Sequence, residues 1–224
     1  MEHRPGMANF LAGGIYAITG DDFSRGRTGA EVVRQLLAAG VRVVQYREKD
    51  KSARGMYEEC KLIRDLTRGA GATFIVNDRV DLAMAVGADG VHVGQDDLPP
   101  ASVRELVGPD MVIGFSTHTA AHAHAAEKLA GVIDYIGVGP VFATGTKKDA
   151  AAPVGLTLIE YVANNIALPF VAIGGIKEDN IGEVRRRGAA TIALVSDLIG
   201  AADIAAKVAA LNAALAENTP LRSA

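Results

Sequence analysis

The sequence predicts an α/β protein, a single-domain (β/α)8 TIM barrel. Short runs rich in β-branched residues recur eight times along the chain, and segments with a helical spacing of apolar residues separate them. This regular alternation predicts a parallel sheet with helices outside it. Eight such units in about 200 residues suit a closed barrel, whereas an open doubly wound sheet, the alternative, usually has fewer strands.

The predicted strands are short apolar runs, as expected for a parallel sheet that is buried on both faces. Each run is bounded by glycine or by polar residues, which limits the length of the strand. In chain order the strands span residues 14–19, 41–46, 73–76, 90–93, 111–115, 134–138, 169–173 and 190–195.

The predicted helices lie between these strands and carry apolar residues on one face, as Val32, Val33, Leu36 and Leu37 do in the first of them. They span residues 29–39, 55–68, 80–86, 101–107, 120–130, 156–164, 178–187 and 201–216. Glycine often stands just before a strand, where it can end the preceding helix in the left-handed conformation. These glycines are Gly40, Gly71, Gly87, Gly108, Gly131 and Gly188.

The composition is that of an ordinary globular protein. Of 224 residues, 49% are hydrophobic and 22% are charged, which excludes a disordered chain and a coiled coil and allows one large core. A net charge of −3 gives no overall attraction for nucleic acid, and no apolar run is long enough to span a membrane. We expect one barrel domain over residues 11–216, with a flexible tail at 1–10 and another at 217–224.

Cys60 is the single cysteine, so no disulfide can form within the chain. Residues 1–10 lack the apolar segment of a signal peptide, and the two observations together predict a reducing compartment, the cytoplasm. Cys60 lies in a predicted helix without a histidine partner, so we expect a buried, inert thiol. The histidines of the 118–124 segment lack the further ligands that zinc requires, and we expect a surface helix start there, with His118 lining the site.

Polar side chains collect directly after the predicted strands, and in a closed barrel these strand ends meet on one face. Asp78 and Asp97 follow neighbouring strands, so their carboxylates are expected to approach one Mg²⁺, which usually takes one or two carboxylates besides water or phosphate oxygens. Arg47, Lys49 and Lys147 would neutralise the charge of a diphosphate. Taken singly, each of these residues also suits a solvated turn.

A second, monophosphate site is expected where barrels often bind phosphate through backbone N–H groups, after the last two strands. Gly174 and Gly175 follow the seventh strand and Ser196 follows the eighth. The loop 140–154 carries two threonines and two lysines, and loops of this length inside a compact domain are usually functional. Ser116 does not lie in a G-x-S-x-G elbow, which argues against a serine hydrolase.

These motifs, taken in order, resemble those of the thiamine phosphate synthase family. The resemblance covers roughly residues 14 to 200. The segments that carry it are Q-Y-R-E-K at 45–49, N-D-R-V-D-L-A at 77–83, G-V-H-V-G-Q-D-D at 90–97, S-T-H-T at 116–119, G-P-V-F-A-T-G-T-K-K-D at 139–149 and A-I-G-G-I at 172–176.

The resemblance implies three groups of site residues. A pyrimidine diphosphate would be bound by Gln45, Tyr46, Arg47, Glu48, Lys49, Asn77, Ser116 and Lys147, of which Ser116 and Lys147 would be catalytic. Mg²⁺ would be held by Asp78 and Asp97. A thiazole phosphate would be bound by Thr144, Gly145, Thr146, Gly174, Val195 and Ser196.

The implied reaction joins 4-amino-5-hydroxymethyl-2-methylpyrimidine diphosphate to a thiazole phosphate, which can be carboxylated, by a dissociative mechanism. Two alternatives stay open: a thiazole tautomerase paralogue and a non-catalytic protein that binds thiamine precursors. The expected partners are small phosphorylated substrates, and neither nucleic acid nor a membrane is expected. The expected assembly is a monomer or a small homo-oligomer. Asp197 departs from the family pattern, which has a small residue there, and we expect its carboxylate to point away from the bound phosphate.

Overall fold

The protein is described by a computed structural model that covers residues 3–146 and 151–218. In this part of the chain, parallel strands pair in sequence order and β8 closes against β1, which gives one closed barrel of eight strands. The strands are β1 (Gly14–Ile18), β2 (Val43–Tyr46), β3 (Thr73–Asn77), β4 (Gly90–Val93), β5 (Val112–Thr117), β6 (Tyr135–Val138), β7 (Phe170–Ile173) and β8 (Thr191–Leu194). The predicted (β/α)8 barrel is therefore confirmed.

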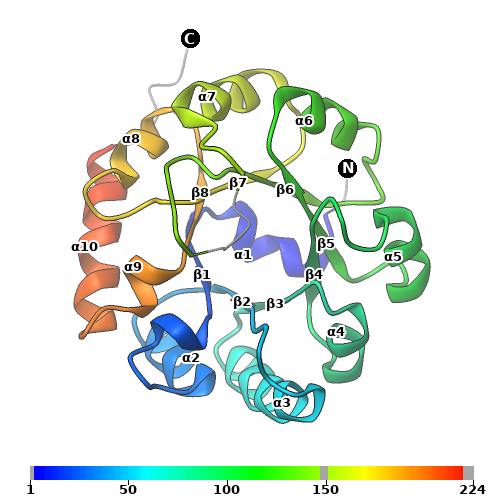
Figure 1. The fold of residues 1–224 in the computed structure, drawn as a ribbon, viewed down its shortest axis with the longest axis vertical. Coiled ribbons are helices and arrows are strands. Elements are labelled where there is room, and N and C mark those ends of the chain that lie inside the picture. The colour runs from blue at the N-terminus through cyan, green and yellow to red at the C-terminus, as the bar shows by residue number, and fades with distance from the viewer. Residues whose placement is uncertain (1–2, 147–150, 219–224) are drawn as a thin grey trace.

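Helices form a ring around the barrel (Figure 1). The ring is built from α2 (Gly29–Ala38), α3 (Ala53–Gly69), α4 (Val80–Val86), α5 (Pro100–Val107), α6 (Ala120–Glu127), α7 (Gly155–Asn165), α8 (Ile181–Arg186) and α10 (Ile204–Glu217). Four short helices were not predicted: η1 (Pro5–Met7), α1 (Ala8–Leu11), η2 (Asp21–Phe23) and α9 (Ser196–Ile199). No helix in residues 3–146 or 151–218 is long and apolar enough to cross a membrane.

Local chemistry fixes where the helices begin and end. Thr28 and Glu31 form a reciprocal capping box at the start of α2, which satisfies two backbone N–H groups that the helix itself leaves unpaired. At the other end of a helix, Gly87 adopts the left-handed conformation and caps α4. All six glycines predicted to stand between a helix and the next strand have positive φ.

The side chains pack in two layers, one on each side of the sheet. Outward-facing residues of the strands contact the apolar faces of the helices, as Ile15 and Ala17 do in β1. Residues of opposite parity, such as Tyr16 and Ile18, point into the barrel and form a separate, smaller cluster. This alternation decides which strand residues can reach the inside of the barrel.

The amino-terminal segment seals one end of the barrel, so the expectation of a flexible tail is wrong for the helical residues 5–10. Met7 is 0% exposed and Phe10 is 4% exposed, and both belong to the interior cluster. The Phe10 ring lies against Tyr135, with ring centroids 4.4 Å apart, and Figure 1 shows α1 within the ring of helices. The physical reason is that the apolar amino-terminal half of the barrel interior would otherwise contact water.

At the carboxyl terminus, α10 includes Glu217, and the predicted tail lies mostly outside the described residues, which end at 218. Asn218 is ordered against its neighbours, since its side chain donates to the Ala214 carbonyl and accepts from Arg186. The described chain therefore remains packed through its last residue.

Replacing Phe10 by alanine should destabilise the protein by about 3–5 kcal/mol, because it removes a large buried ring and leaves a cavity against Tyr135. Leu11 is the matched control, since it follows directly in the same short helix and is 44% exposed. Leu11→Ala should cost less than about 0.5 kcal/mol. Urea unfolding measures both, and equal losses would contradict the assignment of Phe10 as the barrel seal.

Candidate active site

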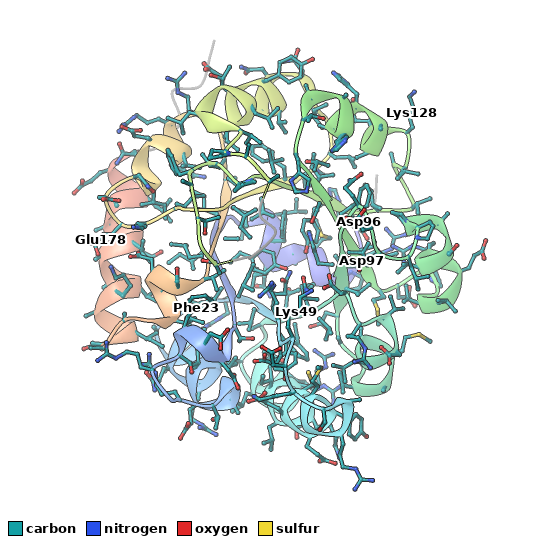
Figure 2. All side chains as sticks on the ribbon, in the orientation of Figure 1. Phe23, Lys49, Asp96, Asp97, Lys128 and Glu178 are labelled. Atoms are coloured by element: carbon teal, nitrogen blue, oxygen red, sulfur yellow. The ribbon has the colours of Figure 1, made fainter. Side chains whose placement is uncertain are left out.

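The loops that follow the strands gather over one mouth of the barrel. Figure 2 labels Lys49 and Asp97 within the ring of helices, whereas Lys128 is labelled at its outer edge. Lys49 comes from the loop after β2, and Asp97 from the loop after β4. Side chains separated by nearly fifty positions in the sequence therefore face a common opening, as expected for the carboxyl ends of a parallel barrel.

Asp78 is fixed in position by its backbone as well as by its side chain. It directly follows β3 and adopts a left-handed conformation with φ 58°, which Asp tolerates better than most residues. Its N–H donates to the His92 carbonyl at 2.8 Å, so the residue is tied to β4. Its Oδ2 accepts from Lys49 Nζ at 2.9 Å, and this pair places a cation beside the carboxylate at the mouth.

Asp97 organises the loop that carries it. Its Oδ2 accepts from the Gly94 N–H at 2.7 Å, which closes a tight turn after β4. The neighbouring Asp96 is exposed. Asp78 and Asp97 thus follow the paired strands β3 and β4, where Asn77 is in register with His92.

The donor set at Asp78 and Asp97 suits Mg²⁺ because both side chains offer hard carboxylate oxygens. Among residues 3–146 and 151–218, no group of three or more His, Cys, Asp or Glu side chains converges as a metal cluster. Two carboxylates fit an ion that keeps water or phosphate oxygens as its other ligands. Asp78 and Asp97 as the ligands of such an ion stay a prediction.

In the predicted segment Gln45–Lys49, the two residues that belong to β2 point to opposite sides of the sheet. Gln45 points into the barrel, where its Nε2 donates to Tyr16 Oη at 2.8 Å. Tyr46 faces the helix layer, and its hydroxyl donates to Glu59 Oε2 at 2.9 Å. The Tyr46 side chain therefore contacts α3 rather than the interior of the barrel.

Glu48 shapes the same loop. Its Oε1 accepts from the Lys49 N–H at 2.8 Å and from the Asp50 N–H at 3.4 Å. Burial acts to raise the pKa of Glu48, but these backbone donors and the Asp21 N–H hold that pKa below its ordinary value. An ionised Glu48 thus orders the backbone beside Lys49.

Cys60 lies behind this loop on α3 and is fully buried. Burial, reinforced by the nearby Glu59 carboxylate, raises the pKa of its thiol to about 12. The thiolate is therefore not populated near neutral pH, in agreement with the prediction of an inert thiol.

Beneath the mouth, polar side chains inside the barrel form a continuous hydrogen-bonded chain. Tyr16 Oη lies 3.0 Å from Tyr135 Oη, which lies 3.0 Å from His92 Nδ1. His92 Nε2 in turn lies 3.0 Å from Ser116 Oγ. Burial lowers the pKa of His92 to about 4, so the imidazole is neutral at pH 7.

Sequence reasoning identified the two ends of this chain, Gln45 and Ser116, but missed Tyr16, His92 and Tyr135. The available signal was a polar or hydroxyl-bearing residue in each of the apolar strands β1, β4 and β6, most clearly in the G-V-H-V segment of β4. Pairing across the barrel could not be found in this way, because it depends on the register of non-adjacent strands.

The predicted thiazole phosphate residues lie together on the other side of the mouth. Thr146 Oγ1 lies 3.4 Å from Ser196 Oγ, which joins the loop after β6 to the end of β8. Thr144 Oγ1 accepts from the Thr146 N–H at 3.2 Å, so the turn around Gly145 is ordered from within. Val195 immediately precedes Ser196 and the short helix α9.

Asp197 points away from this region, as expected. Its Oδ2 accepts from the Glu178 N–H at 3.3 Å and lies 3.5 Å from Lys207 Nζ of α10. Its charge is therefore balanced by the outer helix layer. Lys147, predicted as catalytic, lies outside the described residues, as do 148–150.

Gly174 must be glycine for the loops after β6 and β7 to pack as they do. Its φ is +101°, and a Cβ at this position would lie 2.4 Å from Pro140 Cα. A collision with backbone cannot be relieved by a rotamer change. The residue thus supports the site through the close approach of two loops.

We expect Gly174→Ala to lower the free energy of unfolding by about 1–3 kcal/mol through steric overlap and an unfavourable φ. Gly145→Ala is the control, since a Cβ there would meet no atom within 4 Å among residues 3–146 and 151–218 other than its chain neighbours, and it should change stability by less than about 0.5 kcal/mol. Thermal unfolding of both variants measures the difference. A stable Gly174→Ala protein would show that the two loops need not approach so closely.

Known proteins resemble this chain over nearly its whole length. The sequence pattern of the family described as thiamine monophosphate synthase matches residues 15–198. The thiamine-phosphate synthase of Pelotomaculum thermopropionicum is 61% identical over 213 residues, which cover 95% of this chain and 97% of that protein. The thiamine-phosphate synthase of Lawsonia intracellularis is 50% identical over 201 residues, covering 90% and 92%.

A solved structure supports the same relationship. The thiamine phosphate pyrophosphorylase from Pyrococcus furiosus superimposes with a TM-score of 0.82 at 38% identity, covering 91% of this chain and 95% of that one. A 4-hydroxy-2-oxoglutarate aldolase/2-deydro-3-deoxyphosphogluconate aldolase superimposes with a TM-score of 0.68 at 19% identity, covering 96% and 99%, a likeness of fold alone. From the match over residues 15–198 and the identities to its relatives, this chain belongs to the thiamine monophosphate synthase family.

Proposed function

We propose that the protein is a thiamine phosphate synthase, a transferase of thiamine biosynthesis. It joins 4-amino-5-hydroxymethyl-2-methylpyrimidine diphosphate to a thiazole phosphate and produces thiamine phosphate and diphosphate, with carbon dioxide when the thiazole is carboxylated. The observation that carries this proposal is the arrangement of the mouth. Lys49, Asp78 and Asp97 follow neighbouring strands, and the Thr146–Ser196 contact joins the loops after β6 and β8, a region where barrels often bind a phosphate group.

The reaction breaks the bond between the pyrimidine methylene carbon and the diphosphate oxygen, and the thiazole nitrogen then forms a bond to that carbon. The bonding pair leaves with the diphosphate, and the electron-rich aminopyrimidine stabilises the methylene cation. The protein therefore needs no nucleophile. Its task is to hold both substrates in line and to stabilise charge on the leaving group.

The side chains at the mouth are suited to that task. Lys49 Nζ, 2.9 Å from Asp78, is placed to exchange part of its ion pair for diphosphate oxygens. Asp78 and Asp97 would hold Mg²⁺, which supplies further positive charge to the leaving diphosphate. Arg47 and Lys147 follow from the family resemblance as additional cations for the same group.

We place the protein in the cytoplasm because Cys60 is the single cysteine and is a buried free thiol. A barrel with its mouth built from one chain is compatible with a monomer or a small homo-oligomer. The partners are small phosphorylated molecules, and the formal charge of −3 gives no reason to propose nucleic acid.

The function is tested by mixing both phosphorylated substrates with Mg²⁺ and the full-length protein and measuring diphosphate and thiamine phosphate together. The proposal predicts equal amounts of the two products, and no diphosphate when either substrate is omitted. A thiazole tautomerase would convert the thiazole without releasing diphosphate, and a precursor-binding protein would turn over neither substrate. Running the assay with both forms of the thiazole identifies the preferred one.

Asp78→Asn and Asp97→Asn should each lower the rate of diphosphate release by about 10²–10³-fold, as is typical for one lost electrostatic contact in a transition state. Asparagine tolerates the left-handed backbone at position 78 and can still accept from Gly94 at position 97, so the changes remove charge rather than structure. The rates are measured over a range of Mg²⁺ concentrations, and high Mg²⁺ should partly rescue either variant.

The double variant should be only slightly worse than the poorer single one, because both carboxylates serve one ion. Asp96→Asn is the matched control, as this exposed carboxylate neighbours Asp97, and its effect should be small. Fully additive losses, or activity that a chelator leaves unchanged, would refute a shared metal site.

Ser196→Ala should raise KM for the thiazole phosphate about 10-fold, since it removes one hydroxyl donor to a charged ligand. KM for the pyrimidine diphosphate should change little. Asp197→Asn is the control because the Asp197 side chain contacts Glu178 and Lys207 instead. Steady-state kinetics with each substrate varied in turn measures both constants, and a selective loss of affinity for the pyrimidine would overturn the assignment.

A further inference from the structure

The hydrogen-bonded chain inside the barrel has a defined direction. It runs from Gln45 Nε2 through the hydroxyls of Tyr16 and Tyr135 to His92, and from His92 Nε2 to Ser116 Oγ, with steps of 2.8, 3.0, 3.0 and 3.0 Å. Each tyrosine has one proton to donate, and a neutral imidazole also has one. The proton at one end therefore determines all the others.

The Gln45 end sets the order because an amide nitrogen can only donate. Tyr16 Oη accepts from Gln45, and among the described residues the partner for its own proton is Tyr135 Oη. Tyr135 must then donate to His92 Nδ1. A neutral His92 that accepts at Nδ1 carries its proton on Nε2, from where it donates to Ser116 Oγ.

A doubly protonated His92 would conflict with this arrangement. Both of its nitrogens would donate, so Tyr135 would have to turn its proton back toward Tyr16. Tyr16 would then accept twice and leave its own proton buried without an acceptor, which is costly.

We propose that His92 is a positioning residue whose Nε2–H fixes Ser116 Oγ as an acceptor, so that the serine proton is offered to the pyrimidine diphosphate. Ser116 Oγ has no other hydrogen-bond partner within residues 3–146 and 151–218. A donor held in one orientation by two buried tyrosine rings and a partly buried imidazole loses little entropy when a substrate acceptor arrives. The substrate contact rests on the proposed function, whereas the order of protons does not.

The order of protons is read directly from the nitrogen signals of His92 in the full-length protein labelled with ¹⁵N-histidine. Among the signals of the five histidines, those of His92 are the ones that a His92→Gln variant lacks. At pH 7 we expect a neutral His92 with its proton on Nε2. A proton on Nδ1, or a charged ring, would overturn the proposal even if the enzyme is fully active.

Tyr135→Phe removes the donor to Nδ1, so the preference of His92 for one tautomer should be lost. Tyr161→Phe is the matched control, since its hydroxyl lies 2.9 Å from His124 on the exposed face of α6, and it should leave the His92 signals unchanged. The persistence of one tautomer in Tyr135→Phe would mean that the chain does not orient the ring.

Kinetics separates positioning from a merely structural role. A glutamine at position 92 can place an amide N–H where Nε2 lies, whereas the shorter asparagine cannot reach Ser116. His92→Asn should lower kcat/KM for the pyrimidine diphosphate about 10²-fold and His92→Gln less than about 10-fold, with KM for the thiazole phosphate unchanged in both.

Equal losses of kcat/KM in the two variants would contradict the proposal. So would losses of kcat/KM that are proportional to the decrease in melting temperature of each variant. A protein that releases no diphosphate at all would refute the proposed function while leaving the tautomer measurement to decide the inference.

Discussion

Closure of the sheet is the constraint on which the rest of the structure depends. Because β8 pairs with β1, every strand must turn one set of side chains into the enclosed interior of the barrel. Met7, Phe10 and Ile75 fill the amino-terminal part of this space with apolar groups. The hydroxyls of Tyr16 and Tyr135 lie between these apolar groups and the mouth, and their hydrogen bonds continue through His92 to Ser116. A seal at one end and a polar opening at the other thus follow from the same closed sheet.

This arrangement places ion pairs at the mouth of the barrel and hydrogen bonds between neutral groups in its interior. Charged groups with opposite partners, such as Lys49 and Asp78, are partly exposed at the mouth, where water and ligands can exchange with them. Inside the barrel, hydrogen bonds between protein groups link Gln45, through Tyr16, Tyr135 and His92, to Ser116. A charge at His92 would leave one tyrosine proton of this chain without an acceptor. The site therefore combines exchangeable ion pairs above with a fixed framework of hydrogen bonds below.

The fold was largely predictable from the sequence because strand and helix periodicities differ and glycine marks the helix ends. The eight strands and most helices agree with prediction to within a few residues. The amino-terminal seal was missed, since two turns of helix around Phe10 give too short a periodic signal. At the site, residues after strand ends could be found from position alone. The opposite orientations of Gln45 and Tyr46, and the contacts among Tyr16, Tyr135 and His92, required the strand register and barrel closure.

The position of the metal and the leaving group would show whether the mouth of the barrel binds the diphosphate substrate. Crystals of the full chain grown with inorganic diphosphate and Mn²⁺ in place of Mg²⁺ would locate the ion by its anomalous scattering. We expect a manganese peak shared by Asp78 and Asp97 at the mouth of the barrel, with diphosphate oxygens on the ion and beside Lys49. A metal bound elsewhere, or diphosphate bound away from the carboxyl ends of the strands, would contradict this expectation.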